Sequence, residues 1–168
     1  CAWYLLHTNT MKQIISEIIM ISSITKKRKM YKVELYTPER KKEWNIFIEN
    51  AKNSTFLFDR NYMDYHADRF QDFSLMIYRK NKLYALLPAN KKNDVLYSHQ
   101  GLTYGGLIMS KKSTTLEVIE TFQAINSFLK EQNINKVIYK PIPYIYHQVP
   151  SQEDLYALFK TTDARIIG

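Results

Sequence analysis

Cysteine is almost absent from this chain of 168 residues, because the single thiol is that of Cys1. A disulfide framework and a metal site built from thiolates are therefore excluded, and the expected compartment is the cytoplasm. Long hydrophobic runs are also missing, since the apolar stretch at residues 14–24 covers 11 positions and is interrupted by Ser16 and Glu17. A membrane-spanning helix needs roughly 20 apolar residues, so the sequence predicts no membrane span.

Several short catalytic motifs are absent as well. The chain has no Gly-Lys-Ser/Thr phosphate loop, no Gly-x-Ser-x-Gly elbow and no His-Glu-x-x-His pair. These absences argue against a phosphate-loop ATPase, an α/β-hydrolase and a zincin. His66 and Asp72 would not share a face of a helix that ends near residue 70, so no metal site is predicted.

Positive charge is unevenly distributed along the chain. The formal net charge is +8, and residues 26–42 hold eight basic residues against two acidic ones. A charge confined to one short segment says little about the folded part. It leaves open a basic arm that touches nucleic acid or an anionic membrane.

The two ends of the chain differ from its middle. Residues 1–29 are interpreted as translated upstream sequence or a disordered leader, with a membrane anchor as the alternative, and residues 30–168 as the ordered domain. The last residues, Ile166, Ile167 and Gly168, form an apolar run, from which truncation at the C-terminus is expected.

Hydrophobic periodicity predicts an α/β (α+β) fold. Strands are expected at residues 31–36, 73–78, 83–87, within 95–109 around a glycine-rich loop, and at 136–139, and helices at 38–53, 61–70, 114–132 and 151–159. Thr114 and Glu117 form a capping box, while Ser151 is the expected N-cap of the last helix, with Leu155, Leu158 and Phe159 on its buried face. The order β-α-α-β-β-β-α-β-α predicts a mixed sheet covered by helices on both faces.

Two segments concentrate the groups that carry chemistry. Residues 98–106, SHQGLTYGG, hold three of the four glycines beside an imidazole and a phenol. Glycine permits positive φ and close backbone approach, so this segment predicts a shaped loop. Residues 140–150, KPIPYIYHQVP, add a lysine, two tyrosines and a histidine on a backbone that prolines hold extended.

The element order, together with several short motifs in series, resembles the FemAB-like proteins of the GNAT acyltransferase fold, which are common in bacteria. The motifs are Tyr65-His66, Arg69-Phe70, residues 72–75, residues 87–90, residues 98–106, Tyr146-His147 and residues 153–159. The resemblance covers residues 31–168 and implies a GNAT-like domain that forms the N-terminal half of a two-domain protein.

The resemblance also implies a reaction, namely acyl or aminoacyl transfer to an amine in a cleft between two GNAT-like halves. Acyl-CoA or aminoacyl-tRNA would be the donor, and the acceptor a small molecule, a glycan or a peptide. In an ordinary GNAT domain a glycine-rich turn before a helix binds the pyrophosphate of acyl-CoA. Here the matching segment, residues 110–114, has no glycine, so we expect this half by itself to bind no donor and to be inactive.

Each candidate residue has a functional and a structural interpretation. His99 is the candidate general base, or it shapes its loop through a hydrogen bond. Tyr104 is a candidate hydrogen-bond donor to an oxyanion, or it packs across the sheet. Gly101, Gly105 and Gly106 would line the substrate site. A further set would bind substrate at an anion-binding edge, or belong to a solvated loop with aromatic anchors: Lys140, Tyr146 and His147.

Two functional hypotheses follow. In the first, the chain is the N-terminal half of a FemAB-like acyltransferase, for which the C-terminal half is the partner and tRNA a further one. In the second, the same loop belongs to a non-catalytic GNAT-like module that binds a glycan, a peptide or a nucleotide-bearing ligand. The tyrosines and phenylalanines also fit a stacking platform for single-stranded nucleic acid, although an aromatic core explains them better.

Overall fold

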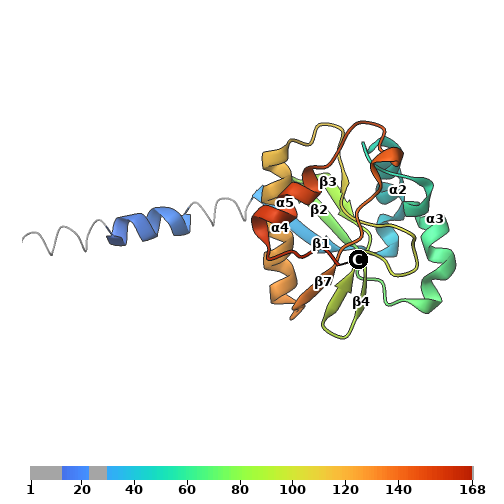
Figure 1. The fold of residues 1–168 in the computed structure, drawn as a ribbon, viewed down its shortest axis with the longest axis horizontal. Helices are drawn as coiled ribbons and strands as arrows, with labels where there is room; N and C mark the ends of the chain where they lie inside the picture. The colour runs from blue at the N-terminus through green and yellow to red at the C-terminus, as the bar shows by residue number, and fades with distance from the viewer. Residues whose placement is uncertain (1–12, 23–29, 168) are drawn as a thin grey trace, which may run out of the picture.

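The computed structural model describes residues 13–22 and 30–167, except for the side chains of residues 66–68 (Figure 1). The interpretation of residues 1–29 as a leader therefore lies outside the described residues, apart from a helix at residues 13–22 whose side chains are exposed. None of the helices in the described part is long and apolar enough to cross a membrane.

The described domain contains short strands, α-helices and 3-10 helices. The strands are β1 (Tyr31–Leu35), β2 (Leu75–Arg79), β3 (Lys82–Leu87), β4 (Asn90–Lys92), β5 (Val95–Tyr97), β6 (Ile108–Met109) and β7 (Lys136–Ile138). The α-helices are α2 (Lys41–Asn50), α3 (Arg60–Met63), α4 (Thr115–Glu131) and α5 (Glu153–Thr161). The 3-10 helices are η1 (Pro38–Arg40), η2 (Phe56–Phe58), η3 (Asp64–Arg69) and η4 (Tyr144–Tyr146).

The strands form two sheets. One is antiparallel with the order β1-β2-β3-β6, and the other has the order β4-β5-β7, in which β5 and β7 are parallel. The tight hairpin between β2 and β3 confirms the prediction made from the polar residues at its turn. Lys80 and Asn81 adopt φ angles of 49° and 61° there, and such left-handed turns match the twist of paired strands.

Helices cover both faces of the larger sheet, and each face has its own hydrophobic core. On one face α4 packs against β1 and α5 packs against α4, and Phe122 and Leu129 of α4 are buried in the core there. On the other face α2 and the segment around α3 bury Trp44, Ile48 and Phe58 against the sheet. Figure 1 shows these two groups of helices on opposite sides of the strands.

The mixed α and β fold with covering helices is thus present, but the predicted order of the elements is wrong by two strands. Between α3 and α4 the structure has five strands, whereas the sequence pattern predicts three. One reason is β4, whose sequence Asn-Lys-Lys lacks the alternation of a strand. The other is that β5 and β6, which the pattern joins as parts of one strand around a loop, pair in different sheets.

Candidate functional site

The glycine-rich segment is a packed crossing point of the chain. A Cβ on Gly105 would lie 1.9 Å from the carbonyl oxygen of Ser98, so only glycine permits this approach. Gly106 has a φ of +94°, and a Cβ there would lie 2.9 Å from the hydroxyl of Tyr139. Both glycines are buried, whereas Gly101 is exposed and lies against the ring of Phe70. Contacts within the chain therefore account for the glycines.

Lys140 connects this crossing to the end of β7. Its backbone N–H donates to Ser98 Oγ at 2.7 Å, and its carbonyl accepts from the Gly105 N–H at 3.1 Å. Its ammonium group donates to the carbonyl oxygen of Leu102. Burial lowers the pKa of Lys140. The side chain expected at an anion-binding edge is therefore used to hold the loop.

His99 is buried beside the same crossing, with 7% of its surface exposed. Its ring meets the ring of Phe70 edge-on, with the centroids 5.6 Å apart. No described residue offers a hydrogen-bond partner to Nδ1. Burial lowers the pKa of His99 to about 4, although Asp72 opposes this shift. The imidazole is therefore neutral near pH 7, the form that can accept a proton, but its affinity for the proton is low.

Tyr104 joins the two segments that the sequence singles out. It is 8% exposed, and its ring stacks on that of Tyr146 with the centroids 5.0 Å apart and the planes at 24°. Its hydroxyl donates to Thr55 Oγ1 at 3.2 Å. The structure thus places residues 98–107 beside residues 138–146, and Tyr104 belongs to the core under α2.

A buried arginine that sequence reasoning misses lies near His99. Arg60 is 1% exposed and forms an ion pair with Asp72. Its guanidinium lies over two rings, 3.5 Å from the centroid of Tyr36 and 4.1 Å from that of Trp44. Planar stacking on aromatic rings is characteristic of arginine and compensates for burial. In the sequence, the only signal for a buried arginine here is the number of aromatic residues near Arg60.

The structure also contains an open pocket of about 610 Å³ where α4 and α5 begin. It is lined by Thr115, Tyr144, His147, Pro150, Ser151, Gln152, Glu153 and Tyr156. His147 is the one residue of the predicted site among them. The connection from η4 to α5 forms one wall, and α4 contributes through its first residue.

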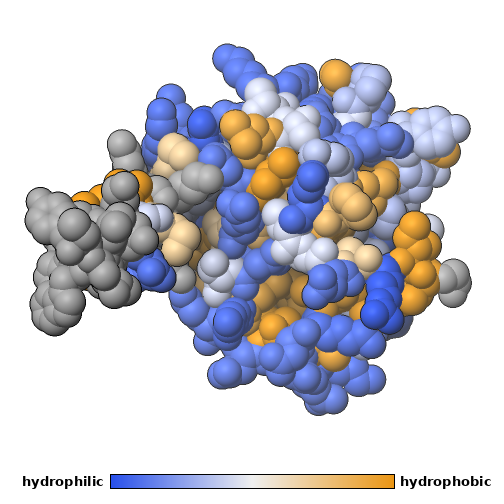
Figure 2. Space-filling view, turned by 60° about the vertical axis from the view of Figure 1, so that its left-hand side comes forward, coloured by the Kyte–Doolittle hydropathy of each residue, from blue (hydrophilic) through white to orange (hydrophobic). Residues whose placement is uncertain are grey.

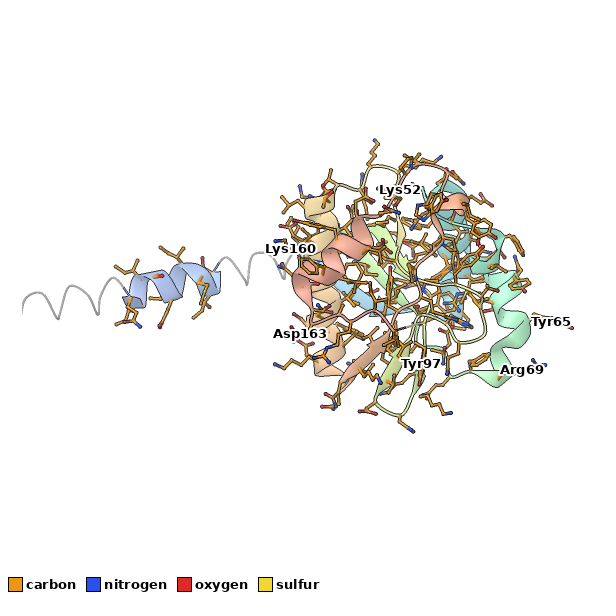
Figure 3. All side chains as sticks on the ribbon, viewed as in Figure 1. Lys52, Tyr65, Arg69, Tyr97, Lys160 and Asp163 are labelled. Carbon is orange, nitrogen blue, oxygen red and sulfur yellow. The ribbon has the colours of Figure 1, made fainter. Side chains whose placement is uncertain are left out.

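Lys52 anchors the elements around this pocket, in the upper part of the domain in Figure 3, far from Tyr65 and Arg69 at the right-hand edge. It is 3% exposed, and its ammonium lies 2.5 Å from Glu153 Oε1 and 3.3 Å from the carbonyl oxygen of Ser113. Its own carbonyl accepts the N–H of Gln148 at 2.9 Å. Lys52 thereby links the end of α2 to the starts of α4 and α5.

A short chain of hydrogen bonds joins the pocket region to the glycine crossing. The Leu107 N–H donates to the hydroxyl of Tyr139 at 2.7 Å, and that hydroxyl donates to Asp154 Oδ2 at 2.6 Å. Burial raises the pKa of Tyr139 well above its usual value and also raises that of Asp154. The second residue of α5 is therefore fixed by the loop that contains Gly106.

Among residues 13–22 and 30–167, no cluster of three histidine, cysteine, aspartate or glutamate side chains is placed to hold a metal ion. The side chains of His66 and Asp68 lie outside the described ones.

Similarity to known proteins covers part of the sequence. No protein-family model matches the chain. The chain is similar to the RecBCD enzyme subunit RecB of Buchnera aphidicola subsp. Acyrthosiphon pisum (strain APS), with 30% identity over 138 residues, or 71% of this chain. The chain spans 12% of the length of RecB.

Proposed function

We propose that the chain is the N-terminal half of a FemAB-like GNAT acyltransferase, which transfers an acyl or aminoacyl group to an amine in the cytoplasm of a bacterium. In this proposal the chain forms one wall of the reaction cleft, and a second GNAT-like half holds the donor. The proposal rests on the motif series together with the geometry of the turn between β6 and α4.

The turn between β6 and α4 is the observation that supports a donor site in the other half rather than in this one. The Ser113 N–H donates to the Ser110 carbonyl at 3.0 Å, and the Thr114 N–H donates to Glu117 Oε2 at 3.2 Å. The Glu117 N–H in turn donates to Thr114 Oγ1 at 3.4 Å. A pyrophosphate at a helix N-terminus needs free backbone N–H groups. Since these three N–H groups have partners within the chain, they are not free to bind a pyrophosphate, and this supports an acyl-donor site in the other half.

The outer surface of α5 supports a partner half. The sequence pattern predicts that Leu155 and Phe159 are buried, but they are 45% and 74% exposed, and Ile145 in η4 is 66% exposed. Figure 2 turns the side with α4 and α5 forward and shows hydrophobic patches on it. Large apolar patches on a protein surface mark interaction sites. A second domain seated on α5 would remove these side chains from water.

The test is an assay of the complete polypeptide that the gene encodes. It is incubated with amine acceptors and, in turn, with acyl-CoA, an acylated carrier protein and aminoacyl-tRNA. Transfer from one donor is expected, and His99→Ala is expected to lower kcat, whereas Lys82→Ala at the exposed start of β3 serves as the control. Absence of transfer from all three donors would contradict the proposal.

The second candidate is a non-catalytic binding module, which the packed state of the glycine segment favours. Gly105 and Gly106 contact the chain itself, and the proton affinity of His99 is low. Ligand binding without turnover in the parent protein is the result that selects this candidate. Binding that survives His99→Ala while turnover is lost selects the enzyme.

A further inference from the structure

Four exposed lysines lie on two turns near the start of α4, and we refer to them as the lysine cluster. Lys80 is in the hairpin turn between β2 and β3, and Lys82 is the first residue of β3. Lys111 and Lys112 form the turn that follows β6. The side chains of all four are exposed, so their charges face the surroundings of the protein.

The pairing of β3 with β6 brings the two turns together. Beyond the last paired residues of these strands, the Ser110 N–H donates to the Tyr84 carbonyl at 3.3 Å. In the sequence Lys82 is two residues from Tyr84, and Lys111 directly follows Ser110. The two pairs of lysines therefore share one end of the larger sheet.

The acidic groups beside these turns are already paired. Glu117, in the first turn of α4, binds the Arg79 guanidinium at 2.9 Å and accepts the Tyr84 hydroxyl at 3.0 Å. Glu153 is paired with Lys52. None of the four lysines forms an ion pair with a described residue. The cluster is therefore a patch of like charges that a partner of negative charge would stabilise.

The residue types in the two turns favour an extended anionic surface as that partner. Residues 80–83 and 110–114 contain no arginine for bidentate phosphate binding and no aromatic ring on which a base could stack. None of the four lysines lines the pocket at the starts of α4 and α5. Lysine acts as a point charge, and each lysine near an anionic lipid surface strengthens binding about fivefold.

We propose that the lysine cluster docks this domain on the anionic headgroups of a lipid bilayer. Four lysines at about fivefold each give half-saturation at about 1 mM accessible lipid. The contact is electrostatic and lies at the headgroups, so it depends on the lipid charge and on the ionic strength. It does not depend on acyl transfer, and because the transfer assay contains no vesicles, Lys82→Ala remains a valid control there.

The experiment is co-sedimentation of the whole chain with vesicles of phosphatidylcholine, either alone or mixed with phosphatidylglycerol. Binding is expected to the mixed vesicles only, and it is expected to be lost in about 1 M salt, where the Debye length is roughly 3 Å. Lys111→Gln/Lys112→Gln is expected to weaken binding about 25-fold, and Lys80→Gln/Lys82→Gln by a similar factor. Because these side chains are exposed, neither variant removes a buried contact.

Lys92→Gln/Lys136→Gln is the matched control, because it removes the same charge from two exposed lysines elsewhere. Both residues pair with Val95, so they are neighbours in the smaller sheet. Figure 1 shows the start of β7 at the opposite end of α4 from the turn after β6. The 17 residues of α4 span about 25 Å, well beyond the Debye length of about 8 Å at physiological ionic strength. The affinity of this control is expected to change by less than about twofold.

The basic residues at positions 26–29 are retained in every variant, so their contribution cancels in the comparison. Equal binding to both kinds of vesicle, unchanged affinity in both cluster variants, or equal losses in the cluster and control variants overturns the inference. Binding of DNA or RNA oligonucleotides that the cluster variants weaken, with the mixed vesicles left unbound, overturns it as well. Because no acyl donor is present, failure here leaves the acyl-transfer proposal standing, and failure of the transfer assay leaves the lipid contact standing.

Discussion

Replacing Gly105 by alanine tests whether the glycine-rich segment is a packed crossing. The added Cβ would lie 1.9 Å from the Ser98 carbonyl oxygen and 2.8 Å from its carbonyl carbon. Both are backbone atoms, so no side-chain rotation relieves the overlap. The two segments must separate, and the hydrogen bond from the Gly105 N–H to the Lys140 carbonyl is then strained as well.

The expected cost follows from these two effects. Overpacking a filled interior costs about 1–3 kcal/mol, and the rigid backbone places this site at the upper end. The weakened hydrogen bond adds about 1 kcal/mol, for a total of about 3–4 kcal/mol. A domain of this size loses about 2–4 °C of Tm per kcal/mol, so Gly105→Ala is expected to lower Tm by about 10 °C.

Gly101→Ala is the matched control. Its Cβ would lie 2.5 Å from the far edge of the Phe70 ring, a side chain that can move, and Gly101 itself is exposed. The smaller freedom of alanine in the unfolded chain offsets part of the strain, so the cost is expected to stay below about 1 kcal/mol. Thermal unfolding followed by circular dichroism measures both variants. An unchanged Tm for Gly105→Ala, or equal losses in the two variants, would refute the packed crossing.

Three further predictions concern buried polar groups. Ser151→Ala is expected to leave the free energy of unfolding unchanged or raise it by up to about 1 kcal/mol, because the Ser151 hydroxyl has no well-formed hydrogen bond. Ser74 is equally buried but bonds to both the N–H and the carbonyl of Ala89, so Ser74→Ala is expected to lower the free energy of unfolding by about 1–3 kcal/mol. Equal losses in the two variants, measured by urea unfolding, would contradict this. The unfolded chain binds a proton at His99 near pH 6.5 and the folded chain only near pH 4, so stability is expected to fall by about 3 kcal/mol as the pH is lowered from about 7 to about 4. His99→Gln should remove this part of the pH dependence, and an unchanged pH profile would speak against it. Lys52→Met leaves the Glu153 carboxylate buried without a cation and is expected to cost about 3–5 kcal/mol, which adding Glu153→Gln should partly restore in a double-mutant cycle; equal stability of the single and double variants would argue against the pairing.

Local sequence was sufficient where neighbouring residues decide the structure. Thr114 and Glu117 form the capping box that their spacing predicts, and α4 ends against Gln132 as expected. The turn at Lys80 and Asn81 also joins two antiparallel strands as predicted. In each case the interacting groups lie within a few residues of one another, so these features do not depend on contacts with distant parts of the chain.

The start of α5 shows where this local reasoning fails. The pattern predicts Ser151 as the N-cap, but the helix is capped at Gln152, and no described group bonds to the Ser151 hydroxyl. The backbone before α5 is held by the N–H groups of Gln148 and Val149, which both donate to the Lys52 carbonyl. A contact across nearly a hundred residues therefore decides a feature that the four-residue pattern could not.

The sequence by itself determined the rarity of glycine and the helical and hairpin segments, and it predicted which residues are candidates for a functional site. Only the tertiary structure decided what those residues do. Gly105 and Gly106 meet Ser98 and Tyr139, and the pocket arises where Lys52 reaches Glu153, 101 positions further along the chain. The physical reason is that capping and turns depend on neighbouring residues, whereas burial, ion pairing and unsatisfied polar atoms depend on which distant segments share one small volume.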